Sequence, residues 1–214
     1  MNEEALAIAK PFLSQTAKHS QVGSSFVLTA QFVLKESHFH PSLTDFEHAV
    51  LNVNAYPRTG RYLGFPIDLF EKSIILKPAT HPGDECVIYQ KTGSSEMFNV
   101  TARHYVLKLW NSEKNKSRTR IEWSLCNHVF ENGRFQGEFA SVLNASQENT
   151  IYTPDNSGYW EYDRSSRTIN FGITIDIGIP VSHPKLLQKL LTVLPLTLMR
   201  ERWQIEDFEK FVMV

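Results

Sequence analysis

Residues 168–177 alternate without interruption between large apolar side chains and small or polar ones. The apolar positions are Ile169, Phe171, Ile173, Ile175 and Ile177. The positions between them hold Asn170, Gly172, Thr174 and Asp176. Successive side chains of a β-strand point to opposite faces, so this pattern predicts a strand with one buried and one polar face. Such a strand needs neighbouring strands and a second layer over its apolar face.

Other segments also have the composition of strands. Residues 25–36 alternate in the same way, beginning with Phe26 and Leu28. The segments rich in β-branched and aromatic residues are 70–79, 85–93, 97–111, 118–130, 138–146 and 157–163. Short turns separate them, and Asn132-Gly133 is a typical two-residue hairpin turn, since both positions need positive φ. Short connections of this kind predict an antiparallel sheet.

Helices are expected in three places. Residues 2–18 show helical spacing, and a second helix capped by Ser42 or Thr44 extends to residue 53. The third covers 183–214, where Pro195 should produce a kink. Its apolar stripe consists of Leu187, Leu190, Leu191, Leu194, Leu198 and Trp203. The order of elements predicts one α+β domain over residues 1–214, with the last helix covering the apolar face of the sheet.

Composition narrows the classes of function. Lys+Arg number 22 and Asp+Glu 23, for a net charge of −1, so no overall attraction to nucleic acid is expected. The sequence contains no stretch of about 18 apolar residues, so no membrane-spanning helix is predicted. The N-terminus begins acidic and lacks the pattern of a secretory signal. We therefore expect a cytoplasmic protein in which Cys86 and Cys126 are reduced and buried.

Three passages resemble a known superfamily in their order along residues 25–213. The first is 48–64, an early helix followed by a turn. The second pairs a strand containing Tyr89 with one that carries Val100, Arg103, Tyr105 and Val106. The third is a hairpin that carries Gly158, Trp160, Thr168, Asp176 and Gly178. Together they resemble the START-like helix-grip superfamily (SRPBCC, Bet v 1-like), although His104 stands where an acidic residue is usual and residues 58–61 lack a Trp.

The resemblance implies a curved antiparallel sheet wrapped around a long C-terminal helix, with an apolar cavity between them. It also implies a ligand such as a lipid, a sterol-like molecule, a polyketide or an aromatic metabolite. We therefore predict a binding or transfer protein for a hydrophobic small molecule. The expected ligand-binding residues are Tyr89, Arg103, Tyr105, Trp123, Trp160, Phe171, Leu187, Leu191 and Leu194. Trp110 and Tyr162 are further aromatic residues expected near the cavity, and no cofactor or metal is expected.

Two other classes of function are open. The first is an enzyme similar to polyketide cyclases and aromatases, in which His104 or Arg103 acts with a tyrosine hydroxyl. In that case desolvation would shift the pKa of the polar group in the pocket. The second is an interaction module whose aromatic residues simply fill the core. The oligomeric state is left open.

Weaker patterns are more readily explained without a site. His38 and His40 lack a third metal ligand at a diagnostic spacing, and Cys126 with His128 lacks a nucleophile motif. A basic cluster lies around one hairpin tip and consists of Lys114, Lys116, Arg118 and Arg120. With a neutral total charge, this cluster predicts a solvated hairpin and no nucleic-acid site. At most it predicts a transient contact with anionic lipid headgroups.

Overall fold

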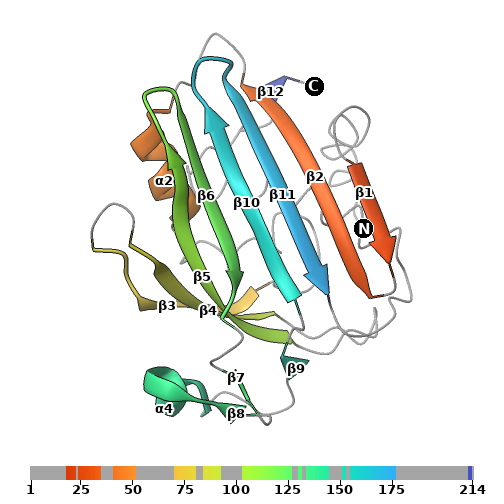
Figure 1. Ribbon diagram of the computed structural model, residues 1–214, viewed down its shortest axis with the longest axis vertical. Coiled ribbons are helices and arrows are strands. Elements are labelled where there is room, and N and C mark those ends of the chain that lie inside the picture. Colours follow the sequence, from red (N-terminus) through yellow and green to blue (C-terminus); the bar gives the residue numbers. More distant parts are fainter. Residues whose placement is uncertain are drawn as a thin grey trace.

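The computed structural model is organised around one large β-sheet (Figure 1). It describes residues 18–22, 24–34, 41–51, 70–80, 84–92, 103–126, 130–131, 134–144, 151–152, 155–176 and 212–213. The strands are β1 (Lys18–Val22), β2 (Ser25–Leu34), β3 (Phe70–Lys77), β4 (Cys86–Thr92), β5 (Arg103–Lys114), β6 (Arg118–Leu125), β7 (Phe130–Glu131), β8 (Arg134–Phe135), β9 (Ile151–Tyr152), β10 (Asp155–Asp163), β11 (Thr168–Asp176) and β12 (Val212–Met213). The helices are α2 (Leu43–Leu51), the 3-10 turn η3 (Gly137–Phe139) and α4 (Ala140–Asn144).

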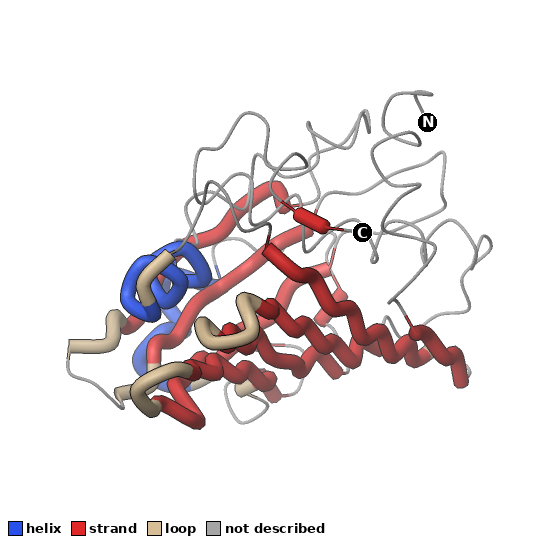
Figure 2. Tube along the Cα trace, turned by 90° about the horizontal axis from the view of Figure 1, so that it is seen from above, coloured by secondary structure: helices blue, strands red, loops and turns tan. Residues whose placement is uncertain are grey.

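The strands of the main sheet follow the order β1-β2-β11-β10-β6-β5-β4-β3. Neighbours in this order are antiparallel, as are β2 and the short strand β12, whereas β9 pairs with β5 in parallel. The pairing of β2 with β11 joins the early part of the chain to its later part. β3 and β4 cross the direction of β10 and β11 at a steep angle, and the sheet is a curved layer (Figures 1 and 2). The prediction of an antiparallel sheet is confirmed in the part of the chain that the structure describes.

The strand register divides the side chains between two faces. Phe171 lies opposite Trp160 on one side and Ala30 on the other, and Trp160 lies opposite Ile121. We call the face that carries these residues the inner face, and the opposite face the outer face. The buried apolar side chains of the inner face are Phe26, Leu28, Ala30, Cys86, Ile88, Tyr105, Leu107, Leu109, Ile121, Trp123, Leu125, Trp160, Tyr162, Ile169, Phe171 and Ile173. The alternation in 168–176 therefore predicted this face correctly.

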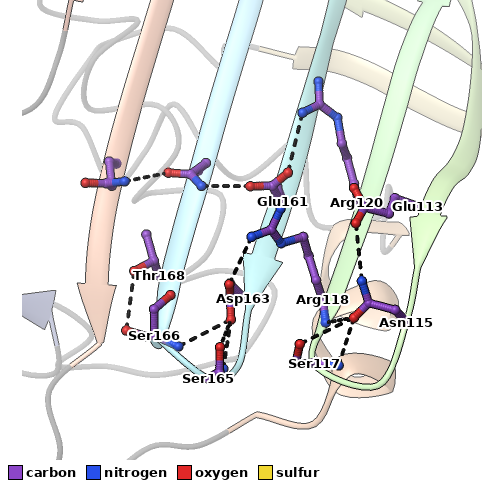
Figure 3. A network of polar contacts seen from close by, with 12 residues as sticks. Glu113, Asn115, Ser117, Arg118, Arg120, Glu161, Asp163, Ser165, Ser166 and Thr168 are labelled. Atoms are coloured by element: carbon purple, nitrogen blue, oxygen red, sulfur yellow. Dashed lines mark hydrogen bonds and ion pairs between the residues drawn. The ribbon is translucent and has the colours of Figure 1, made fainter.

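The outer face carries a polar chain across four strands (Figure 3). Gln31 donates to Asn170 at 3.0 Å, and Asn170 donates to Glu161 at 2.9 Å. Glu161 also accepts a hydrogen bond from Arg120 at 3.4 Å. Partly exposed contacts of this kind stabilise a sheet only modestly, so this face is a solvated surface rather than a second core.

A small apolar cluster lies at one end of the outer face. Hairpin β7–β8, η3 and α4 supply its upper layer, and β4 and β5 supply its floor. Its buried members are Val87, Tyr89, Val106, Cys126, Phe135 and Leu143. Sequence composition predicted a strand over 138–146, and this prediction is wrong. Gly137–Phe139 form a 3-10 turn and Ala140–Asn144 an α-helix, and this helical stretch places Phe139 and Leu143 against the cluster. Their separation of four residues fits one face of a helix or of a strand, so the spacing did not distinguish the two.

α2 confirms the predicted second helix and its cap at Ser42. The Ser42 backbone N–H donates to Asp45 Oδ2 at 2.9 Å, and the Asp45 N–H donates to Ser42 Oγ at 3.0 Å. The Asp45 carboxylate also accepts a hydrogen bond from Ser42 Oγ at 2.7 Å, and this bond, followed by the one from the Ser42 N–H, holds the pKa of Asp45 below its ordinary value. Phe46 and Val50, four residues apart, are fully buried, and the helix contacts β6 and β10 on the inner face.

Near the C-terminus the structure corrects one boundary of a predicted helix, and most of both predicted terminal helices lies outside the described residues. Val212 and Met213 pair with Leu34 and Val33 of β2, so the expected helix over 183–214 does not reach them. The remainder of that segment and residues 2–17 lie outside the described part of the chain. β1, which begins at Lys18, was not expected. None of the helices described is long and apolar enough to cross a membrane.

Candidate functional site

Three aromatic side chains form a continuous apolar floor on the inner face. Trp160 and Phe171 lie in directly opposed positions of β10 and β11, with ring centroids 4.5 Å apart. Trp123 from β6 approaches Phe171 at 5.9 Å. All three are buried. Aromatic surfaces of this size suit a flat or elongated apolar ligand, and they also suit a packed core.

Gly158 allows Trp123 to lie across the neighbouring strand. The two residues are directly opposed in β10 and β6. A Cβ atom at residue 158 would come within 2.3 Å of both the Trp123 ring and the Gly172 carbonyl oxygen. Glycine is therefore required here so that the indole can cover the strand. The orientation of the ring also brings Trp123 Nε1 to Asn156 Oδ1, to which it donates at 3.0 Å.

Polar side chains gather at one end of this floor. Asn156 also shares a hydrogen bond with the Tyr105 side chain, and this bond partly offsets the rise that burial causes in the Tyr105 pKa. Gln90 lies opposite Tyr105 in the register and donates to Ser73 Oγ at 3.3 Å. Arg103, two residues before Tyr105, is 4% exposed, and burial lowers its pKa. The inner face thus joins an apolar floor to a buried polar end.

The opposite end of the floor lies beneath α2. Glu47 accepts hydrogen bonds from Thr119 Oγ1 at 2.7 Å, Asn111 Nδ2 at 3.0 Å and Lys114 Nζ at 2.8 Å. These contacts attach α2 to the β5–β6 hairpin. One residue earlier in α2, Phe46 packs against Tyr162 with ring centroids 5.3 Å apart.

The structure brings together five of the expected ligand-binding residues and separates one. The inner face carries Arg103, Tyr105, Trp123, Trp160 and Phe171. Tyr89 lies on the outer face, because Gln90, its neighbour in β4, is the residue that faces the inner side opposite Tyr105. Leu187, Leu191 and Leu194 lie outside the described residues.

His104 is also on the outer face, directly next in sequence to the inner-face residue Arg103. Its ring centroid lies 5.1 Å from that of Phe135 and 6.3 Å from that of Tyr89. Burial, with a smaller contribution from the charge of Lys91, lowers the pKa of His104 to about 4. The sequence hypothesis that His104 acts as an acid or base on a ligand of the inner face is therefore wrong. A role for Arg103 with the Tyr105 hydroxyl is compatible with their shared face.

Several other sequence candidates have different outcomes. Trp110 lies opposite Glu122 on the outer face, beside the Lys108 ammonium, whereas Tyr162 lies on the inner face. Among the described residues no three His, Cys, Asp or Glu side chains gather as a metal site would require, and His38, His40 and His128 lie outside them. Burial raises the pKa of the Cys126 thiol, which disfavours the nucleophilic thiolate.

Three inner-face residues were not expected from the sequence: Ser73, Gln90 and Asn156. Alternation could have found Asn156, because it is two residues before Gly158 and four before Trp160. No alternation in the sequence identifies Ser73 and Gln90. Buried residues occupy consecutive positions in β4, so the sequence of this strand does not show which of its faces is the inner one.

Solved structures establish the class of this fold. A STAR-related lipid transfer protein from Xanthomonas axonopodis is similar with a TM-score of 0.55 and 9% identity, covering 87% of this chain and 88% of that one. Human StAR-related lipid transfer protein 5 gives 0.52 and 10%, over 96% and 97% of the two chains. The human StarD13 lipid transfer and protein localization domain gives 0.51 and 10%, over 95% and 100%.

The fold is therefore similar to that of START domains, as the sequence resemblance implied. At these identities the similarity concerns the fold alone. No protein-family model matches the sequence, and no curated protein matches it.

Proposed function

We propose that this protein binds a hydrophobic small molecule on the inner face of its sheet and transfers it between sites. The observation that carries the proposal is the floor of Trp123, Trp160 and Phe171 with a buried polar end beside it. Residues 183–211, as the long C-terminal helix, would cover this floor in one domain, with Leu187, Leu191 and Leu194 facing the ligand. The similar solved structures are named as lipid-transfer proteins, which supports this class of ligand.

The arrangement favours an amphipathic ligand rather than a pure hydrocarbon. Arg103, Tyr105 and Asn156 offer polar groups at one end of an apolar surface. Polar groups placed at one end of an apolar site orient a ligand within it. Lipids, sterol-like molecules, polyketides and aromatic metabolites all fit this description. We place the protein in the cytoplasm, which the two buried free cysteines support.

Filling the floor tests this proposal. Phe171→Trp, and Leu191→Trp on the proposed covering helix, should each lower the affinity for 1-hydroxypyrene by about tenfold or more, because the larger ring occupies ligand space. Fluorescence anisotropy of the probe measures binding, and circular dichroism reports whether each variant is folded. Val27→Trp is the matched control, because Val27 lies on the outer face and is 40% exposed. Unchanged binding by both folded variants would contradict the site.

Native mass spectrometry of the protein purified from its own host gives an independent measurement. A ligand retained on the inner face would appear as added mass on the wild-type chain. The same mass should be absent from folded Phe171→Trp and present on Val27→Trp.

A further inference from the structure

The hydroxyl group of Tyr162 is a buried polar group that the described part of the protein does not satisfy. Tyr162 is fully buried and lies opposite Thr119 in β6 and Ile169 in β11, on the inner face. Its hydroxyl oxygen has no hydrogen-bond partner among the described residues. Buried polar groups in proteins are nearly always hydrogen-bonded, so such an atom requires an explanation.

The hydroxyl of Thr119 is engaged by its polar neighbours, whereas Asn111 Oδ1 is a second buried atom without a hydrogen-bond partner among the described residues. The Thr119 hydroxyl donates to Glu47 at 2.7 Å and accepts from Asn111 at 3.1 Å. On the other side of the Tyr162 ring lies the apolar ring of Phe46. Among the described residues at this end of the inner face, none forms a hydrogen bond with the Tyr162 hydroxyl.

Tyr162 is also next to the apolar floor. It is two residues from Trp160 in β10, so the two side chains are neighbours on the same face. A molecule lying on Trp160 and Phe171 would therefore extend to the Tyr162 hydroxyl. The same hydroxyl would be unpaired whenever the floor carries only hydrocarbon.

We infer that Tyr162 selects ligands carrying a neutral hydrogen-bonding group, a hydroxyl or a carbonyl, at the end that lies beneath α2. This inference rests on the proposed function. A neutral group is favoured because Tyr162 is fully buried, and a charged group brought to its hydroxyl would lose its hydration. Burial also raises the pKa of Tyr162, which keeps its hydroxyl protonated and able both to donate and to accept.

The test compares two probes that share one apolar ring system. 1-Hydroxypyrene carries a hydroxyl where 1-methylpyrene carries a methyl group of similar size. Wild-type protein should bind 1-hydroxypyrene more tightly, by about fivefold to tenfold. Tyr162→Phe should remove this preference by weakening 1-hydroxypyrene alone, because the variant loses one oxygen and no apolar contact.

The thermal stability of Tyr162→Phe provides a second readout, because the effect of the substitution should differ in sign between the ligand-free and the ligand-bound protein. Removing an unpaired buried hydroxyl should leave the thermal midpoint of unfolding unchanged or raise it. With 1-hydroxypyrene bound, the wild type should instead be the more stable protein. A residue with a purely structural role would shift both states in the same direction.

Tyr89→Phe is the matched control. Tyr89 is also fully buried and its hydroxyl also has no hydrogen-bond partner among the described residues, but it lies on the outer face within the cluster of Phe135 and Leu143. This variant should retain the wild-type preference. If Tyr162→Phe keeps the preference, or weakens both probes equally, the inference about Tyr162 is overturned while the proposed function stands. If wild-type protein binds neither probe, the proposed function is overturned and this inference with it.

Discussion

At the scale of single residues, the position of His104 decides its chemistry. Lys91 lies directly opposite it in β4, and the rings of Tyr89 and Phe135 pack against it. With its pKa lowered to about 4 by burial and by Lys91, the imidazole is neutral near pH 7. Its protonation would bring a charge into the outer cluster.

This placement predicts a specific loss of stability in acid. The unfolded imidazole has a pKa near its ordinary value of 6.5, and the folded one is near 4. The contribution of the neutral form is complete above about pH 6.5 and is lost as the pH falls toward 4, because the unfolded state then binds the additional proton. In urea unfolding, the free energy of unfolding of the wild-type protein should fall between about pH 7 and pH 4.5. In His104→Phe this fall should be smaller by up to about 3 kcal/mol.

Exposed His48 supplies the control for this measurement. His48→Gln, near the end of α2, should keep the wild-type dependence on pH. If the free energy of unfolding of His104→Phe depended on pH as strongly as that of the wild type, His104 would not remain neutral in the folded protein.

At the scale of elements, α2 is attached to the sheet by its buried side chains Phe46 and Val50 and by the hydrogen bonds of Glu47. Two of its three donors, Thr119 and Asn111, lie on the inner side of the β5–β6 hairpin, and Thr119 is fully buried. Glu47→Ala should lower the free energy of unfolding by about 2–3 kcal/mol, because it leaves those donors without their acceptor. Glu47→Gln should lose clearly less, since an amide oxygen can still accept. Lys114→Ala should cost under about 1 kcal/mol, as its side chain is half exposed. Equal losses for Ala and Gln in urea unfolding would show that these hydrogen bonds do not attach the helix.

The observed strands and helices also show which sequence patterns were sufficient to predict secondary structure and its buried face. Strict alternation over 168–176 identified both the strand and its buried face, because one face packs on the core and the other forms the chain of Gln31, Asn170 and Glu161. Composition without periodicity gave a wrong strand at 138–146, where Phe139 and Leu143 are four residues apart, a separation that fits one face of a helix or of a strand. For the site, Arg103 and Tyr105 were both expected to bind the ligand, and they do lie on one face, as two residues separated by one position in a strand must. Tyr89 was misplaced, since its face depends on the register of β4 against β5, which the sequence does not specify.

At the scale of the whole molecule, the sheet joins two hairpin tips that are far apart in sequence. The Arg164 N–H donates to the Ser117 carbonyl at 2.8 Å, so the β10–β11 turn lies beside the β5–β6 turn. Asp163 Oδ1 and Asn115 Oδ1 shape the two turns by accepting nearby backbone N–H groups (Figure 3). The basic residues of the joined tips are Lys114, Lys116, Arg118, Arg164 and Arg167.

Ion pairs compensate part of this positive charge. Lys114 is paired with Glu47, and Arg118 with Asp163 at 3.2 Å. Lys116 and Arg164 are exposed on the adjacent tips. This surface is more basic than the single hairpin that the sequence suggested, because its second half comes from a segment about 50 residues away.

A transfer protein must meet the membrane that supplies its ligand, and we expect this basic surface to make that contact. Wild-type protein should float weakly with vesicles containing phosphatidylserine, and not with phosphatidylcholine alone. Lys116→Glu combined with Arg164→Glu should reduce the bound fraction by about tenfold or more, at about 1 kcal/mol for each basic residue. Lys77→Glu with Arg134→Glu makes the same change in net charge at exposed positions away from the tips and should bind like the wild type. If both double variants lost binding equally, binding would depend on the total charge of the protein and not on the tips. If the protein floated equally with both kinds of vesicle, the basic residues of the tips would not contribute to binding. Only a loss confined to the tips assigns the contact to the surface that the sheet register creates.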